Sequence, residues 1–174
     1  MRLPILAVAA AAVLALFGSS TEAARMWLPK AENPYCDITT YRARELPEQA
    51  MSLLDSNGKP AIVVSGLVLT EKPSYGQFLM AHECCHHRLG HIRRYREGLG
   101  HVGPQPFFYI APALRQMELD ADCCAVKMLR QERRPDSIVS ARDAMLKFGV
   151  EPTGAYYPTG VERAENMQRC AAEE

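Results

Sequence analysis

One pentapeptide limits how this chain can fold more than any other part of its sequence. His82, Glu83 and His86 form the pattern H-E-x-x-H, with two cysteines between the glutamate and the second histidine. Residues at positions i and i+4 share one face of an α-helix, so both imidazoles can reach a single metal ion. The spacing of apolar residues around the motif predicts a helix from about Ser74 to Arg94, with Ser74 in a capping-box pattern at its start.

Glu83 occupies a different place on this helix from the two histidines. Helix geometry turns it by about 100° from His82, so its carboxylate flanks the metal rather than binding it. That placement suits a general base acting on a zinc-bound water molecule. A helix with two partly buried histidines and a surface glutamate is the alternative interpretation. A third protein ligand would favour the metal site, because a catalytic zinc has three protein ligands and one open position.

A second acidic pattern offers that third ligand. Glu118 and Asp122 belong to E-x-x-A-D, again at positions i and i+4, on a helix predicted from about Pro112 to Glu132. We expect Glu118 to bind the metal and Asp122 to accept a hydrogen bond from a ligand histidine, which fixes the orientation of its ring. A solvated acidic stripe is the alternative. His91 is a weaker candidate, because the extended pattern H-E-x-x-H-x-x-G-x-x-H would place the last histidine one position later.

The two motifs together resemble those of the gluzincin metallopeptidases. The resemblance is to small exported relatives of the CAAX prenyl endopeptidase and of bacterial quality-control proteases. It rests on MAHECCHHRLGH and ELDADCCA, and it extends over about residues 61–167 through AIVVSGLVL and YYPTGVERAENM. The resemblance implies a minimal zincin-like domain with a small sheet and an active-site helix that carries H-E-x-x-H.

The resemblance also implies roles for individual residues. His82, His86 and Glu118 would bind one zinc ion per chain. Glu83 would be the general base, and Asp122 would orient His82. The activity implied is hydrolysis of peptide bonds in exported or envelope proteins. The apolar strand that precedes the metal-binding helix would be an edge strand, and the polypeptide substrate would pair with it.

The chain departs from the family pattern near its C-terminus. The family has histidine before a late proline, where this chain has Tyr157 before Pro158. Tyr157 or Arg163 would then donate to the developing oxyanion, because a phenol or a guanidinium supplies such a hydrogen bond. Packing of Tyr157 and a salt bridge of Arg163 are the alternatives. A prenylated substrate is not expected, because the chain has no transmembrane segment after residue 24.

The first 24 residues have the layout of a secretory signal peptide. Arg2 precedes an apolar run from Leu3 to Phe17, and small residues follow up to Ala24. The run is shorter than the roughly 20 residues of a membrane span, although a retained N-terminal anchor is the alternative. We therefore expect a signal peptide at residues 1–24 and a single metallopeptidase domain at residues 25–174. The mature chain would be exported, to a bacterial periplasm or as a secreted protein, with no stable membrane span.

The charge balance gives no reason to expect a nucleic-acid partner. The chain has 20 basic and 20 acidic residues, so its formal net charge is zero. A basic surface patch is the usual footprint of nucleic-acid binding. The basic run at Arg93–Arg96 is interpreted as a solvated helix end.

Six cysteines follow the predicted signal peptide, an even number that suggests disulfides in an exported chain. They are Cys36, Cys84, Cys85, Cys123, Cys124 and Cys170. We expect one of Cys84 and Cys85 to bond to one of Cys123 and Cys124, once or twice, which would join the two metal-binding helices. Cys36 and Cys170 would then tie the two ends of the domain. Buried reduced cysteines are the alternative.

The overall pattern predicts an α+β fold in which helices predominate. The other predicted elements are a helix from about Glu45 to Ser56 ended by Asn57-Gly58, a strand from Pro60 that ends between Ser65 and Thr70, a loop from Gly98 to Pro112, a helix capped by Asp136 that ends before Gly149, and a helix from Val161 to Ala172.

A second class of function is also consistent with these motifs. The chain would then be a non-catalytic periplasmic chaperone or adaptor domain stabilised by zinc. Glu83 argues against it, because a structural site needs no base, and a structural zinc has four protein ligands.

Overall fold

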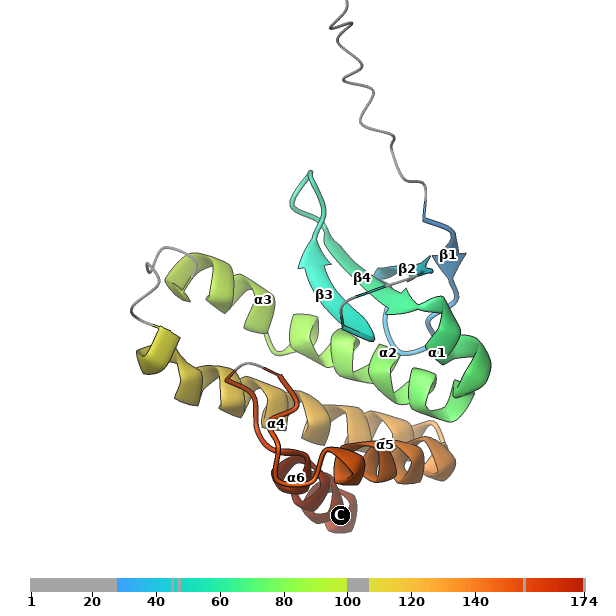
Figure 1. The fold of residues 1–174 in the computed structure, drawn as a ribbon. Helices are drawn as coiled ribbons and strands as arrows, with labels where there is room; N and C mark the ends of the chain where they lie inside the picture. Colours follow the sequence, from blue (N-terminus) through green and yellow to red (C-terminus); the bar gives the residue numbers. More distant parts are fainter. Residues whose placement is uncertain (1–27, 45, 47, 100–106, 155, 174) are drawn as a thin grey trace, which may run out of the picture.

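The computed structural model describes residues 28–44, 46, 48–99, 107–154 and 156–173, so the predicted signal peptide lies outside the described residues. The described part is an α+β fold in which helices predominate, as the sequence predicted. A small sheet lies on one side of helix α2, and helices α4, α5 and α6 lie on the other (Figure 1). No helix among the described residues has the length and apolar character needed to cross a membrane.

The sheet has four strands in the order β1-β2-β4-β3. They are β1 (Lys30–Ala31), β2 (Thr39–Ala43), β3 (Ala50–Leu54) and β4 (Pro60–Ser65). The apolar strand β4 is buried and runs parallel to β2 on one side and antiparallel to β3 on the other. The expectation that this strand is an edge is therefore wrong, because neighbours occupy both of its sides. The edge strand nearest the metal-binding helix is β3.

Strand β3 lies where the sequence predicted a helix, at about residues 45–56. That prediction is wrong because β3 pairs with β4 along its length, from Ala50 opposite Val64 to Leu54 opposite Pro60. A tight turn joins the two strands. The Asp55 carboxylate accepts hydrogen bonds from the backbone N–H groups of Asn57 and Lys59, both at 2.8 Å. Gly58 adopts the left-handed conformation, with φ of 75°, which favours glycine.

Six α-helices and one π-helical segment follow the sheet in the described residues. They are α1 (Gly66–Glu71), α2 (Pro73–Arg88), α3 (His91–Arg94), the π-helix η1 (Tyr95–Leu99), α4 (Phe107–Gln131), α5 (Pro135–Phe148) and α6 (Gly160–Ala172). The predicted helix at residues 74–94 is thus two helices. Gly90 separates them, because its left-handed φ of 72° does not continue a helix.

The ends of several helices differ from the predictions for physical reasons. Ser74 and Asp136 do not cap their helices, because Pro73 and Pro135 begin α2 and α5 one residue earlier, at the position that best tolerates proline. Helix α4 begins at Phe107, inside the predicted loop, and contains Pro112. The helix nearest the C-terminus agrees with the prediction to within one residue.

Three disulfides connect the layers of this fold. Cys85 bonds to Cys124 and joins α2 to α4, as predicted. The predicted bond between Cys36 and Cys170 is wrong, because Cys36 bonds to Cys84 and Cys170 bonds to Cys123. Adjacent residues on a helix point about 100° apart. One cysteine of each pair therefore reaches the other metal-binding helix, and its neighbour reaches a different element.

Candidate metal centre

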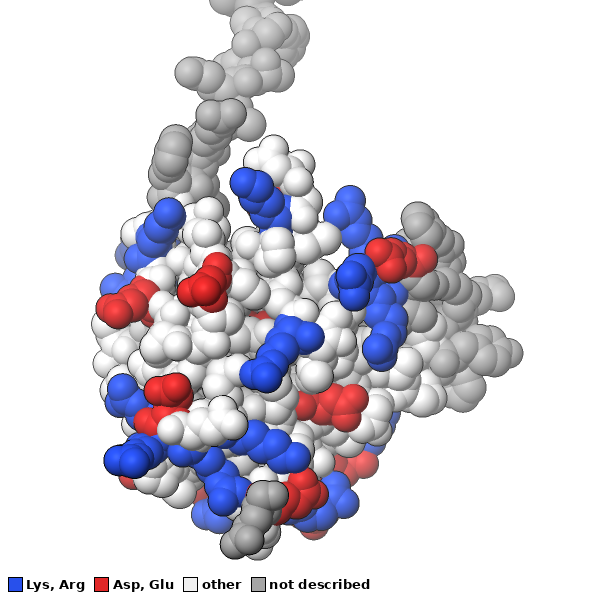
Figure 2. Space-filling view, turned by 180° about the vertical axis from the view of Figure 1, so that it is seen from behind, with Lys and Arg blue, Asp and Glu red and all other residues white. Residues whose placement is uncertain are grey.

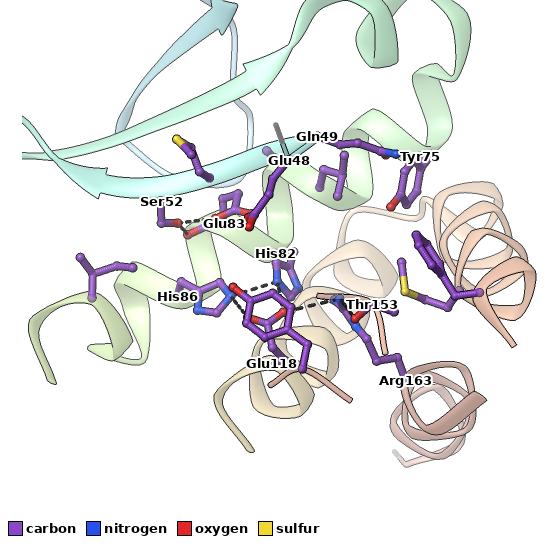
Figure 3. Close-up of a pocket in the computed structure, with 17 residues that line it drawn as sticks. Glu48, Gln49, Ser52, Tyr75, His82, Glu83, His86, Glu118, Thr153 and Arg163 are labelled. Carbon is purple, nitrogen blue, oxygen red and sulfur yellow. Dashed lines mark hydrogen bonds and ion pairs between the residues drawn. The ribbon is translucent and has the colours of Figure 1, made fainter. Parts of the chain in front are cut away.

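Helices α2 and α4 pack side by side and bring the three predicted ligands to one point (Figure 3). His82, His86 and Glu118 are all buried, and their ligand atoms lie within 4.8 Å of one another. The Nε2 atoms of the two histidines are 2.9 Å apart. The Glu118 carboxylate lies 3.4 Å from each of them, through Oε2 to His82 and through Oε1 to His86. The group could therefore hold one metal ion.

The donor set fits a tetrahedral ion of the size of zinc. Bonds of about 2.0–2.1 Å from nitrogen and oxygen would place neighbouring ligand atoms about 3.3 Å apart. The two contacts of Glu118 match this spacing, and the two Nε2 atoms are a few tenths of an ångström closer. One carboxylate and two neutral imidazoles are donors that zinc accepts.

His82 contacts Asp122 on its other side, the carboxylate that the sequence predicted to accept a hydrogen bond from a ligand histidine. Nδ1 of His82 lies 2.9 Å from Oδ1 of Asp122, in an ion-pair contact whose N–H direction is not aligned for a full hydrogen bond. Burial opposes a positive charge on His82, but Asp122 and Glu118 outweigh burial and raise the pKa of the ring to about 10. The ring is therefore protonated at neutral pH without a metal, and binding of an ion at Nε2 would displace that proton.

Arg163 on α6 completes the buried network behind the ligands. Its Nε and Nη2 donate to Oδ2 and Oδ1 of Asp122 at 2.8 and 2.6 Å, and Nη1 lies 3.5 Å from Oε2 of Glu118. Asp122 is 0% exposed. Burial would raise the pKa of Asp122, but the Arg163 guanidinium and His82 outweigh burial and lower it. Most N–H groups of Arg163 thus contact the carboxylates of Asp122 and Glu118. This arrangement is the salt bridge that was predicted as the alternative to an oxyanion role for Arg163.

Glu83 lies beside the ligands and does not join them. Its carboxylate is on the β3 side of the two histidines, opposite Glu118 and Arg163 (Figure 3). Oε2 of Glu83 accepts a hydrogen bond of 2.6 Å from the hydroxyl of Ser52 on β3. This is the flanking position that the helix geometry predicted.

An open cleft of about 370 Å³ leads to the ligands. Residue 49 and the first three residues of the edge strand β3, 50–52, form one wall, and Tyr157 and Phe148 lie among the residues of the other walls. Tyr157 is half-buried, and its hydroxyl makes no hydrogen bond with a described residue. Burial first, and the nearby Glu118 second, raise the pKa of Tyr157, so its hydroxyl stays protonated as a donor.

Several residues of the site were not predicted from the sequence. Ser52 reaches Glu83 only because residues 50–54 form a strand. Glu48 lines the cleft, and burial, followed by the charges of Glu118 and Glu83, raises its pKa. A hairpin signal, the Asn-Gly dipeptide at 57–58 between two apolar runs, would have indicated this strand.

His91 was the weaker candidate for the third ligand, and it lies outside the ligand group. It is nevertheless 3% exposed, and its Nδ1 lies 3.1 Å from Nδ1 of His86. Burial and the neighbouring His86 lower the pKa of His91 to about 4.

The electrostatics of this centre are local. On the face of the molecule seen in Figure 2, acidic and basic side chains are interspersed, which agrees with a net charge of zero. The pKa shifts described above have burial and neighbouring side chains as their causes.

A comparison of the chain with models of protein families, with curated proteins and with solved structures finds no match.

Proposed function

We propose that this protein is a zinc-dependent endopeptidase that hydrolyses peptide bonds in exported polypeptides. One observation carries the proposal: the buried group of His82, His86 and Glu118 opens into a cleft in which the Glu83 carboxylate flanks the ligands without joining them. Three protein ligands and an accessible fourth position are typical of catalytic zinc sites, whereas structural sites are closed by four protein ligands. The resemblance of the motifs to those of gluzincin peptidases supports the same activity.

The residues around the cleft divide the reaction between them. When bound, zinc would lower the pKa of a water ligand to about 7 and polarise the scissile carbonyl. Glu83 would accept a proton from the attacking water and then give it to the leaving amine. Ser52 holds that carboxylate in place through its 2.6 Å hydrogen bond.

Strand β3 would bind the polypeptide in an extended conformation. Among the described residues, β3 pairs only with β4, and residues 49–52 line the cleft beside Glu83. Free backbone N–H and C=O groups on an edge strand can add an extended peptide by β-augmentation. The site would thereby hold a backbone segment next to the metal ligands without requiring one particular side chain.

The covalent chemistry of the chain supports an exported location. Three disulfides fit an exported protein, because such bonds persist in oxidising environments. Together with the predicted signal peptide they support a bacterial periplasmic or secreted location. A non-catalytic, zinc-stabilised chaperone or adaptor domain is the competing function, and it gives no role to Glu83.

Metal depletion and reconstitution test the proposed function. The oxidised protein is stripped with a chelator, and Zn²⁺ is returned in steps while cleavage of an unfolded, fluorescently labelled protein is measured. We expect activity to disappear on stripping and to recover fully at one equivalent of Zn²⁺. Binding of one equivalent without any cleavage, over a panel of unfolded proteins, would instead support the adaptor function.

The Tyr157→Phe variant tests the oxyanion donor. Loss of the hydroxyl should lower kcat by on the order of 10²-fold with little change in KM, because the hydrogen bond forms with the charge that develops in the transition state. Steady-state kinetics on a fluorogenic peptide measures both constants. Tyr95→Phe is the matched control, since Tyr95 is an exposed tyrosine on η1. An unchanged kcat for Tyr157→Phe would assign the tyrosine to packing.

The disulfide between α2 and α4 should affect metal binding as well as stability. Replacing Cys85 and Cys124 together by alanine opens a loop with a sequence separation of 39 residues, which should cost about 3–4 kcal/mol in the free energy of unfolding. The Zn²⁺ dissociation constant should rise too, because Glu118 is no longer held in register with the histidines.

The matched control for that variant replaces Cys123 and Cys170, whose separation is 47 residues. Denaturant unfolding should show a similar loss of stability, because the two loops have similar lengths. Chelator competition should show that this control retains the affinity of the wild-type protein for Zn²⁺. Equal affinities in both variants would contradict a role of the α2–α4 bridge in aligning the site.

A further inference from the structure

We infer that His91 is a positioning residue, which holds the metal ligand His86 in the one tautomer that can bind a metal through Nε2. The inference rests on the metal site of the proposed function and adds a residue that neither motif contains. His91 is buried directly against His86: their ring centroids are 5.1 Å apart, the ring planes are inclined by 71°, and their Nδ1 atoms are 3.1 Å apart.

The two nitrogens of His86 face different partners. Nε2 faces Nε2 of His82 and the Glu118 carboxylate, and Nδ1 faces only His91 among the described residues. A neutral imidazole carries one proton, so a lone pair on Nε2 for a metal requires that proton to be on Nδ1. Nδ1 of His86 then donates to Nδ1 of His91, which accepts. The single proton of neutral His91 is then on its own Nε2.

The backbone between the two residues produces this contact. On a continuous helix, His91 would point about 140° away from His86, because five residues at about 100° each exceed one full turn by that angle. Helix α2 instead ends at Arg88, and Gly90 turns the chain with a left-handed φ of 72°. Helix α3 then begins at His91 and returns its ring to the ligand.

The two ligand histidines are consequently held by chemically different groups. His82 contacts the Asp122 carboxylate, an anion paired with Arg163, whereas His86 contacts a second imidazole ring. Groups that contact metal-bound histidines in this way fix ring orientation, and their loss typically weakens metal affinity by about 10–100-fold. His91 would supply this restraint for His86 without adding negative charge beside the site.

Two substitutions separate an acceptor role from simple packing. His91→Leu keeps a buried side chain of similar size but has no acceptor. His91→Asn can place its amide oxygen near the position of Nδ1. His87→Asn is the matched control, because His87 lies on the same helix as His86, contacts the carbonyl of Ala61 instead, and is outside the ligand group.

The Zn²⁺ dissociation constant, measured by chelator competition, should rise about 10–100-fold in His91→Leu and return to within a few-fold of wild type in His91→Asn. The His87→Asn control should bind as the wild-type protein does. Unchanged affinity in His91→Leu, or equal losses in the leucine and asparagine variants, would overturn the inference.

Nitrogen NMR of the imidazoles reads the tautomers in the unsubstituted protein, so the test remains even where His91→Leu does not fold. In the Zn²⁺-bound protein, His86 should carry its proton on Nδ1 and His91 on Nε2. A proton on Nδ1 of His91 would overturn the inference. Because neither readout uses peptide cleavage, an inactive protein with these results would refute the peptidase function alone. A wild-type protein that does not bind Zn²⁺ would refute both.

Discussion

The Glu83→Gln variant is expected to bind Zn²⁺ as tightly as the wild-type protein and to hydrolyse polypeptides about 10³–10⁴-fold more slowly. Glutamine has nearly the size of glutamate, and its amide oxygen can still accept the hydrogen bond that Ser52 now donates. The amide cannot take a proton from the attacking water. The metal ligands His82, His86 and Glu118 are untouched, so binding and turnover should separate in this one variant.

Two measurements on the same preparation establish that separation. Chelator competition gives the Zn²⁺ affinity, and cleavage of a fluorogenic peptide gives kcat/KM. Glu165→Gln is the matched control, because Glu165 is exposed on α6 and is not among the residues that line the cleft. Undiminished cleavage by Glu83→Gln, after purification free of other proteases, would remove Glu83 from the mechanism. Loss of Zn²⁺ binding would show instead that Glu83 is needed to hold the metal.

The ligand group could be assembled from the sequence because its geometry is mostly local. His82 and His86, and likewise Glu118 and Asp122, are pairs at positions i and i+4, whose shared face depends only on helix formation. The cysteine pairs indicated which two helices meet. The bond between Cys85 and Cys124 confirms that inference, whereas the other two bonds depend on where distant elements pack.

The sheet was predicted less well, because local helix propensity gave the wrong secondary structure for one of its strands. Residues 45–56 contain good helix formers, and Asn57-Gly58 was interpreted as a helix stop. The same dipeptide is a strong signal for a two-strand hairpin when apolar runs flank it, and AMSLL and PAIVVS do so here. Pairing with the buried strand β4 outweighed the intrinsic helix propensity of residues 50–54. The edge strand, and with it one wall of the cleft, was therefore assigned to the wrong segment.

His91 and Arg163 make contacts that cannot be predicted from the spacing of residues along the sequence. His91 meets His86 because one left-handed glycine redirects the chain, and a helix extrapolated through Gly90 places it on another face. Arg163 meets Asp122 across 41 positions of sequence, through packing of α6 on α4. In both cases the residue type suggested a role, but only the tertiary arrangement identified the partner.

The Arg163→Met variant is expected to lose about 3–5 kcal/mol in the free energy of unfolding. Arg163 donates two hydrogen bonds to the Asp122 carboxylate, whose residue is 0% exposed. Methionine removes the positive charge but keeps much of the volume, so a buried carboxylate remains with His82 as its main partner. Denaturant unfolding of the metal-free, disulfide-intact protein measures the loss without a contribution from metal binding.

A double variant separates the charge from the packing. Asp122→Asn combined with Arg163→Met removes both charges, so much of the stability lost in the single variant should return. Lys127→Met is the matched control. It breaks an exposed ion pair with Glu173, in which the two side chains are 51% and 59% exposed, and should cost at most about 1 kcal/mol. If Arg163→Met costs no more than this control, the buried pair does not hold α6 against α4. The orientation of His82 would then depend on helix packing alone.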